Sequence, residues 1–178
     1  MRHPLASSIS VAGLAVVAAV LAAAPAQGVG RADAAGVYVT QAKLSGKAAK
    51  PRGEASGVGS VTICVDQVAG TISFAFDQLF ISVRPTAGHI HRGAAGVNGP
   101  VVSPFEVAGA IDPLVGDIQW YGTRTASKGT IAALVSSPTK HYVNVHTKKH
   151  PNGAVRGQLG AWRKVKADDP SAAVCGVG

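Results

Sequence analysis

Two histidines separated by one residue, His89 and His91, are the residues of this sequence best suited to chemistry. Successive side chains of an extended strand point to opposite faces, so both imidazoles share one face and Ile90 takes the other. A third histidine, His146, lies in a later segment with the same alternation. If the two segments are neighbouring strands, three imidazoles converge. Three imidazoles with an open position suit copper in the first place and zinc in the second.

Alternation around His146 predicts which side chains accompany it. The residues expected to point outward are Tyr142, Asn144 and His146, while the valines between them point inward. Tyr142 would lie beside the histidines, and the Asn144 amide could orient an imidazole by hydrogen bonding. His150 lies in the following turn and is either a fourth ligand or solvated. His141 shares a face with the valines and is expected to be a strand-end residue.

The three histidines and Arg156 can also be interpreted as structural residues without a chemical role. In that alternative, His89, His91 and His146 are outward-facing polar residues that hydrogen-bond loops. Arg156 is the candidate catalytic residue, as an electrostatic guide for an anionic substrate over the histidine face. It could instead be structural and pair with an acidic side chain, Asp77 or Glu106, or with a backbone carbonyl, and we favour this second interpretation.

The elements that must position these residues are short β-strands. Runs of β-forming residues, separated by turn residues, are found at 37–44, 55–65, 71–76, 79–83, around His89 and His91, and at 101–107, 118–121, 141–146 and 154–162. One helix is expected from Ser127 to Ser136, where apolar residues recur at helical spacing and Pro138 follows. This pattern predicts an all-β fold, an antiparallel Greek-key β-sandwich or flattened barrel with one short crossover helix.

The first 26 residues have the order of a secretory signal peptide. Charged residues precede an apolar segment from Ile9 to Ala24, and a small-residue cleavage site ends at Ala26. Ala32-Asp33-Ala34 is a second such site, and an uncleaved anchor is a further alternative. We therefore expect a protein that is secreted or associated with the cell wall. Its parts would be a flexible lead-in at 27–36, a domain at 37–163 and a C-terminal tail at 164–178, with no transmembrane segment after the signal.

The charge and the motifs of the sequence argue against two classes of function, specific nucleic-acid binding and hydrolysis. The chain carries 17 Lys and Arg against 9 Asp and Glu, and loss of Arg2 with the signal leaves a net charge of +7. The basic residues are scattered, with neither a recognition helix nor a basic-aromatic pattern, which argues against specific nucleic-acid binding. No nucleophile elbow or paired-carboxylate pattern is present, so a hydrolase is not expected. We expect a monomer with an extracellular or cell-surface partner.

Two cysteines, Cys64 and Cys175, remain in the exported chain, and only one intramolecular pairing is possible. An even count in an oxidising compartment indicates a disulfide. Neither cysteine lies in a CxxC motif or beside a histidine, which argues against metal ligation. The bond would tie the tail back to an early strand and stabilise the fold by up to about 4–5 kcal/mol in the chain-entropy model.

Three stretches in this order and spacing resemble the CHRD domain family, named for its occurrence in chordin and also found in exported bacterial proteins. They are residues 37–46, residues 88–102 with Gly88-His-Ile-His-Arg-Gly, and Tyr142-Val-Asn-Val-His-Thr together with Asn152-Gly-Ala-Val-Arg-Gly-Gln-Leu159. The resemblance covers roughly Val37 to Leu159. It implies an immunoglobulin-like or superoxide-dismutase-like antiparallel β fold outside the cell, and an extracellular binding or structural module rather than a defined reaction.

A more distant similarity links the chain to copper-zinc superoxide dismutases, which also place a His-x-His pair on one strand and another histidine on a later one. The matching positions here are His89, His91, His146 and Arg156. This similarity implies a copper-dependent redox protein as the alternative function. The chain departs from that pattern because it has no His/Asp-rich insert for a zinc site, and Cys64 does not match the usual disulfide.

Overall fold

The fold is described from a computed structural model, which covers residues 36–105, 120–166 and 168–177. It contains nine strands, one α-helix and one 3₁₀ turn. The strands are β1 (Val37–Ser45), β2 (Val58–Asp66), β3 (Thr71–Phe80), β4 (Pro85–Arg92), β5 (Val101–Phe105), β6 (Tyr121–Thr125), β7 (His141–Thr147), β8 (Val155–Gln158) and β9 (Arg163–Lys164). The helix α1 spans Lys128–Ser136, and the 3₁₀ turn η1 spans Pro138–Lys140.

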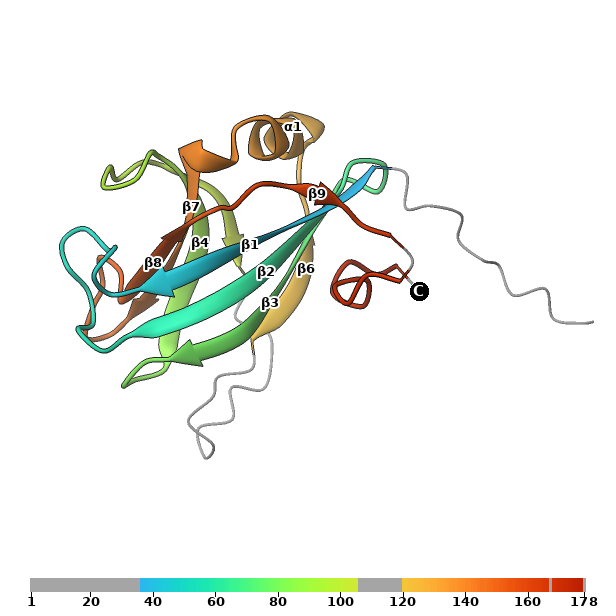
Figure 1. The fold of residues 1–178 in the computed structure, drawn as a ribbon. Coiled ribbons are helices and arrows are strands. Elements are labelled where there is room, and N and C mark those ends of the chain that lie inside the picture. The colour runs from blue at the N-terminus through green and yellow to red at the C-terminus, as the bar shows by residue number, and fades with distance from the viewer. Residues whose placement is uncertain (1–35, 106–119, 167, 178) are drawn as a thin grey trace, which may run out of the picture. The chain divides into compact units, whose positions relative to one another are not determined.

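Eight of the strands form one continuous antiparallel sheet in the order β5-β4-β7-β8-β1-β2-β3-β6, and β9 pairs with β1. The sheet curls so that its two edge strands approach each other, and Arg124 of β6 donates a hydrogen bond of 2.8 Å to the Pro104 carbonyl of β5. Figure 1 shows β1, β2 and β3 side by side, with β4, β7 and β8 continuing the wall. The predicted all-β flattened barrel is confirmed.

Alternation along the strands fills the inside of this barrel. Inward residues of β2, β3, β4 and β7 are almost fully buried and form one core cluster, which includes Val61, Ile63, Ile72, Phe74, Ile90, Val143 and Val145. Trp120 and Phe105 pack on Phe74 and Phe76, with the Phe76 and Trp120 rings stacked at 4.8 Å. Burial of side chains of this size stabilises a fold by about 1.5–3 kcal/mol each.

The helix lies at one end of the barrel (Figure 1), and its bounds agree with the helix expected from Ser127 to Ser136. Ser127 caps its start by accepting a hydrogen bond from the Thr130 amide, which satisfies one of the free amides of the first turn. Ile131 and Leu134 are its buried residues and join the core. No helix among the described residues is long and apolar enough to cross a membrane.

Some strand boundaries differ from those expected. Residues 71–76 and 79–83 were expected as separate runs, whereas β3 is continuous from Thr71 to Phe80. The pairing with β2 passes from Val61 opposite Phe76 to Ser60 opposite Gln78, so Asp77 is an extra residue in β3. Such a bulge breaks the alternation without ending the strand. The end of the run expected at 101–107 and the start of the run expected at 118–121 lie outside the described residues.

The C-terminal tail packs on the outer face of β1 and β2. Cys64 and Cys175 form the predicted disulfide. Around the disulfide lies a second small cluster of buried residues: Val37, Val39, Val165, Ala172 and Val177. The tail is therefore held by a covalent bond and by apolar contacts to the sheet.

Candidate metal centre

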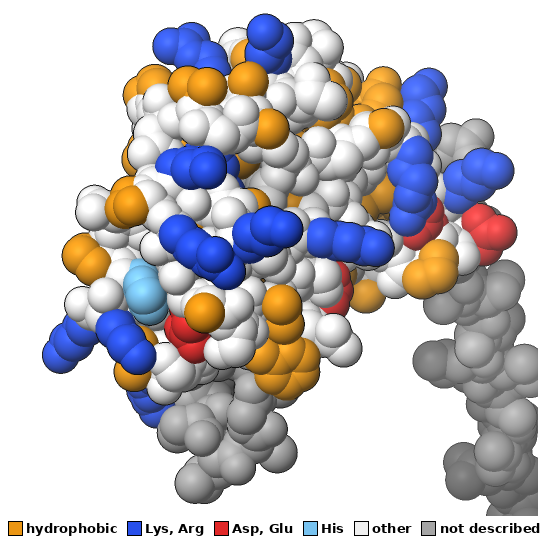
Figure 2. Space-filling model, turned by 60° about the vertical axis from the view of Figure 1, so that its left-hand side comes forward, with side chains coloured by type: hydrophobic (Ala, Val, Ile, Leu, Met, Phe, Trp, Pro, Cys, Tyr) orange, Lys and Arg blue, Asp and Glu red, His pale blue; other side chains and the backbone are white. Residues whose placement is uncertain are grey.

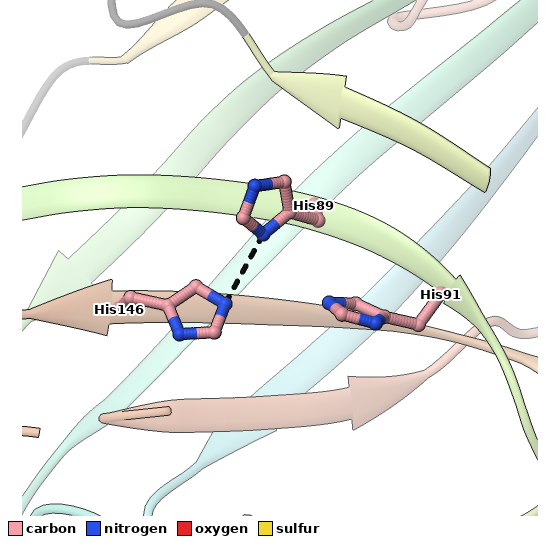
Figure 3. A group of neighbouring side chains, drawn as sticks. All are labelled: His89, His91 and His146. Carbon is pink, nitrogen blue, oxygen red and sulfur yellow. Dashed lines mark hydrogen bonds between the residues drawn. The ribbon is translucent and has the colours of Figure 1, made fainter. Parts of the chain in front are cut away.

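The register of β4 against β7 brings three histidines together. His91 lies opposite Tyr142, His89 opposite Asn144, and Ala87 opposite His146, so His146 is a diagonal neighbour of His89. Ile90, Val143 and Val145 fill the core from the same strands. As Figure 3 shows, His89 and His91 project from one strand and His146 from the next, with the three rings turned toward a common point.

The distances between the imidazole nitrogens are short. His89 Nδ1 lies 3.1 Å from His146 Nε2, and one nitrogen from each of the three histidines lies within 4.8 Å of the others. Two nitrogens bonded to the same copper or zinc ion at about 2.0–2.1 Å can be at most about 4.2 Å apart. That limit is for two nitrogens on opposite sides of the ion; in a tetrahedral site they are about 3.4 Å apart, so a pair 4.8 Å apart would have to close by about 1.4 Å.

Backbone carbonyls fix the tautomers of two of the rings. His91 Nδ1 donates to the Gly99 carbonyl at 2.9 Å, and His146 Nδ1 donates to the Pro151 carbonyl at 2.8 Å. Because each Nδ1 carries the proton, each Nε2 keeps its lone pair. His146 Nε2 then accepts from His89 Nδ1, while His91 Nε2 is buried and has no hydrogen-bond partner. A buried nitrogen without a partner costs about 1–3 kcal/mol.

Electrostatics favour the neutral, ligating form of the histidines on β4. Burial lowers the pKa of His89, the charges of His146 and His91 add to the shift, and together they bring the pKa to about 4. Burial also lowers the pKa of His91, with its hydrogen bond to Gly99 opposing the shift and His146 and Arg156 adding to it. At neutral pH His91 does not have to lose a proton before a metal binds, and His89 can bind through Nδ1 once its proton has moved from Nδ1 to Nε2.

A loop after β4 covers the histidines, so the cluster is less exposed than expected. His91 is only 8% exposed, and its ring stacks on Tyr142 with the centroids 4.9 Å apart. The Tyr142 hydroxyl accepts from the Gly99 amide at 3.1 Å. Gly99 thus joins the histidine and the tyrosine through its two backbone groups. Tyr142 lies beside the cluster as expected, and it is fully buried.

Arg156 lies under the same loop. Its guanidinium is 3.4 Å from the centroid of the Tyr142 ring and donates to the Ala94 and Val97 carbonyls and to the Asn98 side chain. β7 lies between β4 and β8, so Arg156 and His91 are on opposite sides of Tyr142. Of the two interpretations of Arg156, these contacts match the structural one, through backbone carbonyls.

The remaining candidates lie around the cluster. Asn144 donates to the Asn152 carbonyl at 3.2 Å and so contacts the β7–β8 turn, and its Oδ1 is buried without a partner. His150 lies in that turn, where its amide donates to Thr147 Oγ1, and it does not belong to the group of converging nitrogens. His141 begins β7 and donates to the Ser137 carbonyl, consistent with a strand-end residue.

Two contributors were not identified from the sequence, the carbonyls of Gly99 and Pro151. Gly99 directly precedes Pro100, and Pro151 begins the turn Pro151-Asn152-Gly153. A backbone carbonyl has no side-chain signature, and only the path of the loop brings it to an imidazole. The turn residues therefore predicted where the loops lie, but not which of their carbonyls accept hydrogen bonds from the imidazoles.

Comparison with known families assigns the fold. The family model of the CHRD domain matches residues 40–159, which include all of β1 to β8 except the first three residues of β1. Comparison with the curated proteins and with the solved structures gives no match. The matched region contains the three histidines and the loop after β4. The chain belongs to the CHRD domain family.

Proposed function

We propose that this protein is an exported CHRD module that holds one metal ion at His89, His91 and His146 and acts as an extracellular binding or structural protein. The observation that carries the proposal is the buried, unpartnered Nε2 of His91, which points into a group of nitrogens within 4.8 Å of one another. A ligand there would supply the partner that the nitrogen lacks. The donor atoms would be His89 Nδ1, His91 Nε2 and His146 Nε2.

Copper is the metal that this donor set favours. All three donors are imidazoles, which bind copper and zinc, and divalent copper binds most tightly among the first-row ions at nitrogen sites. Bound copper would supply a positive charge and an open coordination position. The chain itself contributes rigid strands, two carbonyl acceptors that orient the rings, and a loop that limits access of water to His91.

Export is supported by the signal-like order of the first 26 residues and by the disulfide between Cys64 and Cys175. N-terminal sequencing of the protein recovered from the culture medium or cell wall tests it. The expected first residue is Gln27, or Ala35 if the second site is cut. A chain that keeps Met1 and stays inside the cell would contradict export.

A copper-dependent redox protein of superoxide dismutase type is the second candidate. The approach of His146 to the His-x-His pair favours it. The position of Arg156 does not, because the guanidinium lies behind the Tyr142 ring and cannot guide an anion to the imidazoles from there. Superoxide turnover by the copper-loaded protein, lost in His91→Ala, would establish the redox function.

The test of metal binding is an equilibrium titration with copper and with zinc, each in a competing chelator. We expect one ion per chain, copper tighter than zinc, and a loss of at least about 100-fold in affinity when His91 or His146 is replaced by alanine, since each supplies one of three bonds. His150→Ala is the matched control and should bind like the unchanged protein. Equal affinities of the His91, His146 and His150 variants would refute the site.

A further inference from the structure

A cavity with a volume of about 380 Å³ lies between the β1–β2 loop and the loop after β4. Three cationic side chains line it, Lys47, Lys50 and Arg156, and no acidic residue does. The cavity is large enough for a small-molecule ligand. Figure 2 shows Lys and Arg side chains spread over the face that it presents, with few Asp and Glu among them. None of the residues that line it is a ligand in the metal site proposed above.

Arg156 at the edge of this cavity is a buried cation without an acidic partner. Its side chain is 2% exposed, and its hydrogen bonds go only to neutral oxygens, those of Ala94, Val97, Asn98 and Gln158. No carboxylate pairs with it among the residues the structure describes, where the recorded ion pair is Arg163 with Asp169. Buried charges in proteins are usually paired, because desolvating an isolated charge is costly.

The two loops are joined in a way that keeps the lysines near the arginine. Asn98 donates to the Lys50 carbonyl at 2.7 Å, and the Asn98 side chain also accepts from Arg156. The Lys50 side chain passes over Gly96, with its Cε 4.0 Å from where a Cβ would stand. The Ala95 and Gly96 amides, at the centre of the turn closed by Val97 and Ala94, donate to no described residue. Free amides beside three cations can bind an anion.

We propose that this cavity binds a phosphate group, free or carried by a small molecule. A charge of +3 from two ammonium groups and one guanidinium matches a doubly charged tetrahedral oxyanion better than a single carboxylate. The anion would supply a negative charge to pair with the Arg156 guanidinium. Since Tyr142 separates Arg156 from His91, the anion would bind outside the metal centre, and the inference does not depend on a bound metal.

The test is titration of the ¹⁵N-labelled exported chain with inorganic phosphate at constant ionic strength, followed by amide chemical shifts. We expect saturable shifts at Lys47, Ala95 and Gly96. In the double variant Lys47→Gln with Lys50→Gln the affinity should fall about ten-fold or more, because two of the three cations are removed. Both lysines are exposed, so the variant keeps its core.

The matched control is Lys148→Gln with Lys149→Gln, which removes the same charge from another exposed segment. It should bind phosphate like the unchanged protein, and acetate should bind the unchanged protein about ten-fold more weakly than phosphate. Shifts that do not saturate, or equal losses in the two double variants, would show general charge screening and overturn the site. Shifts centred on His89 and His91 would place the anion at the metal centre and overturn it too. Equal affinity for acetate would overturn the assignment to phosphate.

Discussion

Replacing His91 by phenylalanine tests whether this histidine serves to bind a ligand or to stabilise the fold. The imidazole is buried, its Nε2 has no partner, and its Nδ1 donates to the Gly99 carbonyl. A phenyl ring can keep the stacking on Tyr142, and its additional atom extends toward the other imidazoles. The variant removes both the unsatisfied nitrogen and the hydrogen bond.

The two effects on the metal-free protein oppose each other, and the gain is the larger on average. Removing the unsatisfied nitrogen is worth about 1–3 kcal/mol, and losing the hydrogen bond costs about 0.5–1.5 kcal/mol. Gly99 is partly exposed, so its carbonyl can turn to water. The free energy of unfolding of His91→Phe should therefore lie between about 0.5 kcal/mol below and about 2.5 kcal/mol above that of the unchanged protein.

Urea unfolding, with EDTA and with copper, measures both consequences. Free copper at 100 times the dissociation constant of the unchanged protein should stabilise that protein by about 2.7 kcal/mol, and His91→Phe, which should bind at least about 100-fold more weakly, by no more than about 0.4 kcal/mol. His141→Phe is the control, because His141 is also buried and donates to a carbonyl but leaves no buried nitrogen unpaired. It should lose stability and keep the copper response. A loss of more than about 2 kcal/mol in metal-free His91→Phe would refute the reasoning, since His91 would then be structural.

Three further predictions concern the disulfide, the pH dependence and the turn beside the site. Replacing Cys64 and Cys175 by serine opens a loop of 111 residues and should lower the free energy of unfolding by up to about 4–5 kcal/mol in urea; a loss below 1 kcal/mol would contradict this. Because the pKa of His89 is about 4 when folded and about 6.5 when unfolded, the unfolded metal-free chain binds more protons between these values, so stability is lost as the pH falls from 6.5 to 4. His89→Asn should lose less stability over this pH range. If the free energy of unfolding falls equally with pH in the two proteins, His89 is not the cause. Gly153→Ala requires a φ of +130° and a Cβ 2.4 Å from Asn144 Oδ1, so it should cost about 1–3 kcal/mol in thermal unfolding, and an unchanged melting temperature would be the opposing result.

The sequence was sufficient to predict the wall of the barrel and the histidine face. Strict alternation around Ile90, Val143 and Val145 decides which side chains enter the core. Their neighbours along each strand, the histidines among them, must therefore lie on the opposite face. Alternation does not reveal which strands are neighbours. The approach of His146 to His89 depends on the pairing of β4 with β7, which are separated by two strands and a helix in the chain.

What the sequence could not predict lies mainly in the loops and at the bulge. The cover over His91 depends on Gly99, whose backbone groups contact His91 and Tyr142. The burial of Arg156 depends on the same loop, whose carbonyls accept from it. At Asp77 one extra residue interrupts the alternation while the strand continues. Each of these features follows from tertiary contacts that no local pattern encodes.

X-ray absorption spectroscopy of the protein, loaded with one equivalent of copper, tests the proposed metal centre most directly. It counts the imidazole nitrogens bound to the ion and measures their distances. We predict three imidazoles at about 2.0 Å in the unchanged protein and two in His91→Phe. A spectrum with no imidazole scattering, or one identical in the two proteins, would contradict the assignment of His89, His91 and His146 as the metal ligands.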